Sequence, residues 1–227
     1  MHPGDAVVIT GPSPPFVSRA GEKLDAALYH FGVDVRGKSA LDAGASTGGF
    51  TDCLLQRGAA SVLAVDVGRD QLHERLRADP RIRRLDGTNI RHLTLADAGG
   101  VPFEVVVADL SFISLRTVAH VLVDELAAPG GDLVLLVKPQ FEAGRAVVSA
   151  GRGVVRDQAA WAGVLESVTS TFAVHGAAMM GVMVSPLTGA DGNVEFLAHA
   201  QAQIPPGPIL DIGAVVAEAA RLHPMGG

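Results

Sequence analysis

A repeated alternation of apolar, β-branched runs with amphipathic segments constrains the fold of this chain more than any other feature. Several of the runs are almost continuously apolar, which is typical of parallel strands that are covered on both faces. The expected strands are residues 39–44, 61–68, 82–87, 103–110 and 132–139. Helical patterns occupy residues 18–32, 48–58, 69–79 and 114–127. This spacing predicts an α/β fold, a doubly wound parallel sheet with helices on both faces.

The last third of the chain has a different pattern. A helix is expected over residues 156–176, followed by strands at 177–185 and 193–202. The turn-rich segment "PLTGADG" joins these two strands, and a pair of strands with so short a connection must be antiparallel. The proline-rich stretch 204–208 ends this pattern, and a short helix over 211–222 can follow it.

Composition limits the class of protein. Hydrophobic residues make up 48% of the 227 residues, enough for a large core, while the net charge of −6 argues mildly against autonomous RNA binding. The single cysteine, Cys53, excludes an intrachain disulfide and a multi-cysteine metal site, and no metal is expected. No secretory leader opens the chain, and its most apolar stretch, 174–184, is too short for a bilayer span of ~20 residues. We therefore expect a cytoplasmic protein without a membrane partner.

A cluster of small residues follows the first expected strand, in "LDAGASTGGFT" (41–51). It lies where open α/β sheets bind ligands, beyond the carboxyl ends of the strands. The spacing lacks the Lys-Ser/Thr of a phosphate-binding loop and the GxGxxG of a dinucleotide site. Asp66 ends the second strand, where a carboxylate suits two ribose hydroxyl groups. The motif favours a nucleoside ligand without phosphate, such as S-adenosylmethionine, over the alternative that small residues merely allow close helix–strand packing.

Five blocks of sequence resemble one family. "FVSRAGEKL", "LDAGASTGGFT", "DLSFISL", "LVKPQFE" and "SPLTGADGNVEF" are similar to the TlyA (hemolysin A) proteins, ribose 2′-O-methyltransferases related to the FtsJ/RrmJ type. The resemblance runs from about residue 16 to 200 with the blocks in order. It implies a Rossmann-like methyltransferase with a seven-stranded, mostly parallel sheet whose last strand is antiparallel. That expectation agrees with the strand pair near the C-terminus.

The resemblance also implies a catalytic tetrad of Lys23, Asp109, Lys138 and Glu195. The ribose 2′-hydroxyl is a poor nucleophile, so its proton must be removed as the oxygen attacks the methyl group. A lysine can act as the base when burial or a neighbouring cation lowers its pKa. Lys138 ends an apolar strand and is the expected base, with Lys23 assisting and the two carboxylates orienting the amines. For each residue taken singly, a solvated charge at a strand end is the alternative.

The glycine turn, the strand ends and the resemblance together predict the residues that contact the cofactor. Asp86, near the end of the third strand, is a weaker candidate for the adenine amino group, and a solvated turn aspartate is the alternative. The full set expected to contact S-adenosylmethionine is Asp42, Gly44, Ala45, Ser46, Thr47, Gly48, Gly49, Phe50, Asp66, Val67, Asp86, Asn89 and Asp109.

The chain departs from the family at its N-terminus, where we expect most of a small RNA-binding domain to be missing, through trimming or as a natural short form. We expect residues 1–15 to be a remnant of that domain with a proline-rich linker, 16–203 the methyltransferase domain, and 204–227 a C-terminal tail. Ribosomal RNA or ribosomal subunits are the expected partners, and the chain can be a monomer or a dimer. The segment 142–157 can be a substrate loop or an ordinary connection. Basic residues that can touch phosphate are Arg19, Arg145, Arg152 and Arg156.

These observations predict an S-adenosylmethionine-dependent 2′-O-methyltransferase acting on ribosomal RNA, where the resemblance implies cytidine. One alternative is a small-molecule O-methyltransferase on the same scaffold. Another is a membrane-active hemolysin, which would need a cationic amphipathic or long apolar segment that the sequence does not show. A third is a remnant that binds the cofactor without catalysis.

Overall fold

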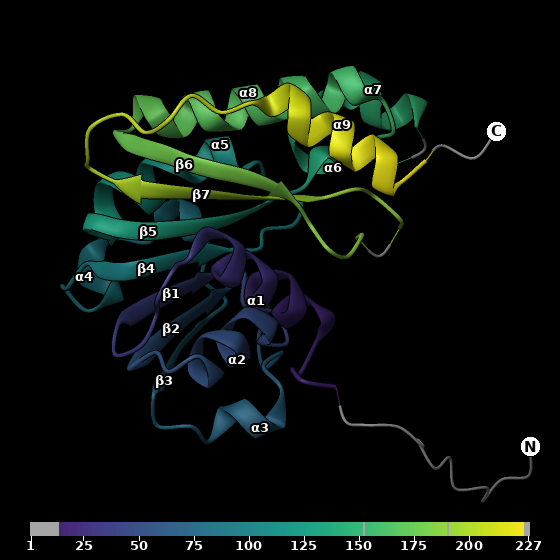
Figure 1. Cartoon of the computed structure of the whole chain (residues 1–227). Coiled ribbons are helices and arrows are strands. Elements are labelled where there is room, and N and C mark those ends of the chain that lie inside the picture. The colour runs from purple at the N-terminus through teal and green to yellow at the C-terminus, as the bar shows by residue number, and fades with distance from the viewer. Residues whose placement is uncertain (1–13, 152, 190, 225–227) are drawn as a thin grey trace, which may run out of the picture.

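The computed structural model describes residues 14–151, 153–189 and 191–224, and its centre is one seven-stranded sheet (Figure 1). The strand order is β3-β2-β1-β4-β5-β7-β6, and β7 is antiparallel to both of its neighbours. The strands are β1 (Ser39–Ala43), β2 (Ser61–Asp66), β3 (Ile82–Asp86), β4 (Phe103–Ala108), β5 (Ala127–Val137), β6 (Ala177–Val184) and β7 (Phe196–Ala202). The predicted fold class is confirmed, including the antiparallel hairpin of β6 and β7.

Helices cover both faces of the sheet. Their bounds are α1 (Arg19–Phe31), α2 (Gly49–Gln56), α3 (Glu74–Arg77), α4 (Leu95–Ala98), α5 (Leu115–His120), α6 (Pro139–Glu142), α7 (Arg145–Ala150), α8 (Gln158–Val174) and α9 (Ile212–Leu222). A 3₁₀ turn, η1 (Ile90–His92), and a π-helical segment, η2 (Val121–Leu126), complete them. One apolar core joins the sheet to α5, η2 and α8, and the other joins it to α1 and α2.

The alternation of side chains along β1 shows how the two cores divide. Leu41 and Ala43 belong to the core under α5 and α8, whereas Ala40 belongs to the core under α1 and α2. Asp42 points to this second face, since its carboxylate meets Thr51 of α2. Successive residues of a strand point to opposite faces, and a shift of one residue in register would exchange the two faces. The register therefore determines which side chains pack against which helices.

The predicted helix over 69–79 is largely wrong, because only the single turn of α3 forms. Asp70 adopts a left-handed backbone with φ +54°, which interrupts a right-handed helix. The guanidinium of Arg77 donates to the carbonyl oxygens of Leu72 (2.6 Å) and Asp70 (2.7 Å) instead. Leu72 and Leu76 are buried beside Gly48, so apolar contact with the glycine turn determines the shape of this connection.

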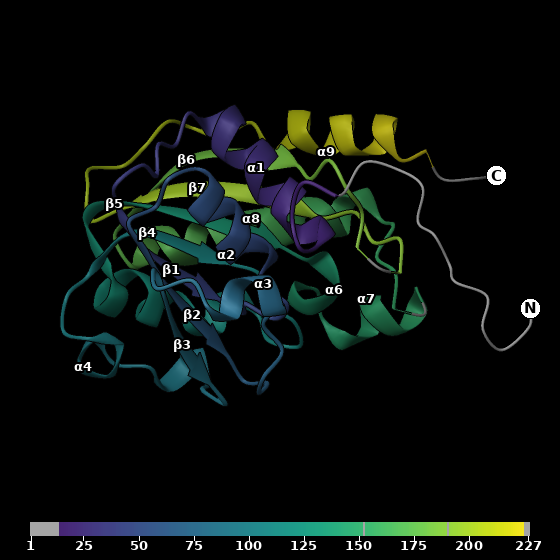
Figure 2. The ribbon, with the colours of Figure 1, turned by 90° about the horizontal axis from the view of Figure 1, so that it is seen from below.

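The carboxyl ends of the parallel strands and the start of β7 share one edge of the sheet. Phe196 at the start of β7 pairs with Val137 at the end of β5, so the residues next to them, Glu195 and Lys138, lie side by side. Figure 2 shows α6 and α7 beyond the ends of the strands on this side of the molecule. Sequence segments that are far apart in the chain thus converge on this rim.

Some predictions fall outside the described residues. The strand and linker expected within residues 1–13 lie there, and so does Arg152. At the C-terminus, residues 204–210 form no helix or strand, and α9 packs on α8 and β6 through the buried Val216 and Ala219.

Candidate functional site

Two lysine–carboxylate pairs lie on the rim of the sheet. Asp109 follows β4 and Lys138 follows β5, and the Nζ of Lys138 is 2.5 Å from an Oδ of Asp109. Glu195 precedes β7, and its carboxylate is 2.5 Å from the Nζ of Lys23 on α1. Because β4, β5 and β7 are consecutive in the sheet, the structure brings all four residues of the expected tetrad to one rim.

The pair of Lys23 and Glu195 is buried, and the surrounding loop is shaped to hold it. The side chains are 10% and 2% exposed, respectively. A Cβ atom on Gly189 would lie 2.6 Å from the carboxylate of Glu195, so glycine at 189 leaves space for the acid. Asn193, also buried, accepts a hydrogen bond from the backbone N–H of Val155 and donates one to the carbonyl of Gly153. The segment before α8 is thereby tied to the loop that carries Glu195.

Lys138 meets further groups besides Asp109. Its ammonium donates to the hydroxyl of Ser111 at 3.1 Å and lies 5.9 Å from the centre of the Phe141 ring. The sequence predicted that Lys138 ends an apolar strand, and in the structure its side chain is 12% exposed and paired with a carboxylate. The ion pair with Asp109 and the hydrogen bond to Ser111 thus fix the position of the Lys138 amine at the rim.

The glycine turn lies directly against the Asp109 backbone. Gly44 has φ +86°, and a Cβ atom there would overlap the carbonyl oxygen of Asp109. The turn also holds the carboxylate of Asp66, which accepts hydrogen bonds from the backbone N–H groups of Ser46 (2.8 Å) and Gly68 (2.7 Å). Glycine at 44 is therefore required both by the left-handed backbone and by this close approach.

A cavity of about 520 Å³ opens between the turn and the loops after β3 and β4. Its wall includes six of the residues expected to contact a cofactor: Gly44, Ser46, Asp66, Val67, Asn89 and Asp109. Sequence reasoning missed other members of the wall, among them Thr88, Ile90, Arg91, Leu110 and Ile113. Most of these lie in loops, where no periodic pattern reveals which side chains face inward.

The other seven expected contacts lie off this wall: Asp42, Ala45, Thr47, Gly48, Gly49, Phe50 and Asp86. Phe50 is buried in the core under α1 and α2. Asp86 instead accepts a hydrogen bond from the N–H of Asp70 and lies 3.7 Å from the guanidinium of Arg84. These residues shape the turn or its surroundings, and their direct contact with a ligand stays a prediction.

Asp42 is fully buried beneath the turn. One carboxylate oxygen accepts a hydrogen bond of 2.6 Å from the Thr51 hydroxyl, and the other has no partner among the described residues. Burial raises the pKa of Asp42 to about 7, the Thr51 hydrogen bond opposes this, and the nearby Asp109 and Asp66 raise it further. Asp42 thus differs chemically from Asp66, whose two oxygens both accept backbone hydrogen bonds.

Phe112 is an aromatic residue on the cavity wall that sequence reasoning did not single out. The residue is 91% exposed, its backbone is left-handed at φ +65°, and its ring centre lies 5.2 Å from that of Phe141. An exposed aromatic ring beside Asp109 and Lys138 is suited to stacking on an unpaired base. The sequence motif contained this residue but gave no indication of its exposure.

Two features are absent from the parts of the chain that the structure describes. Within residues 14–224, leaving aside 152 and 190, no helix combines the length and apolar character needed to cross a bilayer. The same residues contain no group of three or more His, Cys, Asp or Glu side chains that could hold a metal ion.

Comparison with known proteins places this geometry among methyltransferases. A family model described as FtsJ-like methyltransferase matches residues 16–202. YqxC of Bacillus subtilis, named as a candidate rRNA methyltransferase, is 50% identical over 185 residues, which cover 81% of this chain and 65% of YqxC. The 16S/23S rRNA (cytidine-2′-O)-methyltransferase TlyA of Mycobacterium tuberculosis is 48% identical over 196 residues, covering 86% of this chain and 72% of TlyA.

A solved structure agrees over most of the chain. A candidate hemolysin from Streptococcus thermophilus is 41% identical and superimposes with a TM-score of 0.87, covering 93% of this chain and 76% of that one. The chain spans less than two thirds of the length of YqxC.

Proposed function

This chain belongs to the FtsJ-like methyltransferase family, and from that premise we propose that it methylates the ribose 2′-oxygen of a cytidine in ribosomal RNA with S-adenosylmethionine. The observation that carries the proposal is the meeting of the Asp109–Lys138 and Lys23–Glu195 pairs on one rim, beside the cavity. The name of the TlyA relative supplies the substrate, cytidine in rRNA.

The four charged residues fit the chemistry of a ribose hydroxyl. In the proposed reaction Lys138 receives the 2′-proton, and Asp109, 2.5 Å away, stabilises the ammonium that then forms. Lys23, held by Glu195, places a second positive charge on the rim, where it would stabilise negative charge developing on the oxygen.

The cavity has features that fit S-adenosylmethionine. Its volume of about 520 Å³ lies within the range usual for cofactor sites. Each oxygen of Asp66 accepts one backbone hydrogen bond and keeps acceptor capacity for a ribose hydroxyl. Ile90 and Val67 supply apolar wall for a base, and Gly44 leaves backbone open to a close approach. When bound, the cofactor supplies a methyl group on a sulfonium, ready for attack by an oxygen nucleophile.

Methyl incorporation into ribosomal particles tests the proposed function. The purified chain would be incubated with radiolabelled S-adenosylmethionine in three separate reactions, which contain undermethylated ribosomal subunits, protein-free rRNA or free cytidine. We expect label in rRNA that nuclease digestion and mass spectrometry identify as 2′-O-methylcytidine. Label on a base, or on free nucleoside in preference to RNA, would instead support the alternative of a small-molecule or base methyltransferase.

Replacing Asp66 with alanine should weaken binding of S-adenosylhomocysteine by roughly 1–3 kcal/mol, the range for losing hydrogen bonds to a charged partner. Titration calorimetry measures this change directly. Asp34→Ala is the matched control, because the carboxylate of Asp34 also accepts a backbone N–H, from Arg36, but Asp34 lies off the cavity wall. Affinity that is unchanged in Asp66→Ala, or lost equally in both variants, would refute the assignment of ribose binding to Asp66.

A further inference from the structure

Glu142 is a buried carboxylate at the end of α6, one helical turn after Lys138, and its side chain is 2% exposed. Both of its oxygens are engaged by the segment that follows β4. One accepts from the Ser114 hydroxyl at 2.5 Å, and the other accepts from the backbone N–H of Leu115 at 2.6 Å. Through these hydrogen bonds, Glu142 connects the segment after β5 with the segment after β4.

The same connection includes a guanidinium. The Nε of Arg116 lies 3.4 Å from the carboxylate of Glu142, and an Nη of Arg116 donates to the Glu142 carbonyl at 3.1 Å. Ser114 is the N-cap of α5, since its hydroxyl also accepts from the Arg116 N–H. Glu142, the last residue of α6, therefore fixes the first turn of α5 against α6.

These contacts enclose the loop between Asp109 and Ser114. Its first residue is fixed by β1, because the N–H of Asp109 donates to the carbonyl of Ala43 at 3.0 Å. Its end is fixed by Glu142 through Ser114 and Leu115. Between these anchors Phe112 adopts a left-handed backbone that is strained for a bulky residue, so it needs support from its surroundings.

We propose that Glu142 is a positioning residue, which fixes the loop carrying Asp109, Ser111 and Phe112 against the segment carrying Lys138. It acts through these groups and does not touch the reacting atoms. The inference rests on the proposed function, because it concerns the same rim. Without the bonds from Glu142, the Asp109–Lys138 pair would keep its charges but lose its fixed position, and misplacement of about 1 Å is enough to slow a reaction strongly.

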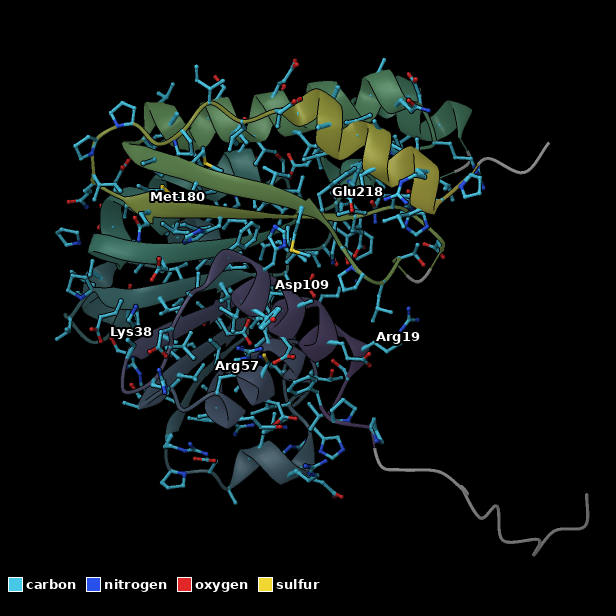
Figure 3. The ribbon with its side chains drawn as sticks, viewed as in Figure 1. Arg19, Lys38, Arg57, Asp109, Met180 and Glu218 are labelled. Carbon is cyan, nitrogen blue, oxygen red and sulfur yellow. The ribbon has the colours of Figure 1, made fainter. Side chains whose placement is uncertain are left out.

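The variant Glu142→Gln tests the proposal, since it keeps the size of the side chain but replaces one acceptor oxygen with an N–H₂ group that faces a donor. Asp132→Asn is the matched control. Asp132 is likewise a buried carboxylate, with three side-chain donors, Lys38, His199 and Gln201. It lies in the middle of β5, and its partner Lys38 precedes β1 at the end of the sheet opposite the rim. In Figure 3, Lys38 marks that end of the sheet and Asp109 marks the rim.

We expect both variants to lower the melting temperature, and only Glu142→Gln to lower kcat. At saturating cofactor and ribosomal substrate, its kcat should fall at least tenfold, while its affinity for S-adenosylhomocysteine stays within twofold of wild type. Asp132→Asn should keep kcat within twofold. Ser114→Ala removes one of the bonds to Glu142 and should lower kcat in the same direction but less, which provides a test if Glu142→Gln does not fold.

Amide hydrogen exchange gives a readout that does not depend on activity. In Glu142→Gln, exchange should become faster in residues 110–116, whereas Asp132→Asn should leave this segment as in wild type. If the wild-type protein methylates no RNA, the proposed function fails, and exchange alone still decides whether Glu142 fixes the loop. Unchanged exchange in 110–116, unchanged kcat in Glu142→Gln, or an equal loss of kcat in Asp132→Asn would overturn the proposal.

Discussion

Replacing Lys138 with alanine is expected to lower the rate of methyl transfer by roughly 10²–10⁴-fold, the usual contribution of a positioned acid or base. Affinity for S-adenosylhomocysteine should stay close to wild type, since Lys138 is not part of the cavity wall. A residue that acts only in the transition state changes the rate without changing binding. Single-turnover kinetics on ribosomal subunits, together with calorimetry, separate these two quantities.

Lys138→Arg decides between two roles for this residue. Arginine keeps the positive charge beside Asp109 but cannot give up its proton at working pH, so it cannot act as a base. We expect the arginine variant to be as inactive as the alanine variant. A nearly wild-type rate in Lys138→Arg would show that the charge only guides the hydroxyl, and that alignment of the reactants is sufficient.

Replacing Asp42 with asparagine should remove a pH-dependent loss of stability. The folded protein raises the pKa of Asp42 to about 7, above its unfolded value, chiefly through burial. The contribution of this group is therefore fully present below the unfolded pKa and is lost as pH rises through about 7. Ionising Asp42 in the folded protein should lower the free energy of unfolding by roughly 2–4 kcal/mol near pH 8. Asparagine does not ionise and avoids this loss.

Urea unfolding between pH 2.5 and 8.5 gives the free energy of unfolding at each pH, and the effect of Asp42 appears as a difference in the slope of this free energy against pH. Asp132→Asn is a control in which the change of stability with pH should have the opposite sign. Burial alone would raise the pKa of Asp132, but hydrogen bonds from His199, Gln201 and Lys38 outweigh it and lower the pKa. The stability that Asp132 contributes is present above its unfolded pKa and is lost as pH falls through its lower folded pKa. Asp132→Asn should therefore lower the free energy of unfolding more at neutral pH than in acid. If Asp42→Asn had the same pH dependence as wild type, Asp42 would not be the buried titrating group.

The parallel sheet and the position of the rim at its strand ends could be predicted from the sequence, because both depend on local patterns. Apolar runs such as 61–68 are nearly continuous, since a parallel strand between two layers of helices is buried on both faces. Gly44 and Asp66 could be placed at strand ends for the same reason, and the structure puts both on the cavity wall. Lys23 and Glu195 depended on the resemblance to a family, because nothing in their spacing links them.

Only the tertiary structure decided which of these residues meet. Lys23 and Glu195 are 172 positions apart, and they touch because β7 inserts beside β5 and starts at the rim. The structure also separated Asp42 from Asp66, which look alike in sequence: one is buried against Thr51 and the other lines the cavity. Strand order, register and loop packing are set by contacts between distant segments. Local sequence therefore specifies that a residue ends a strand, while long-range packing specifies what it faces.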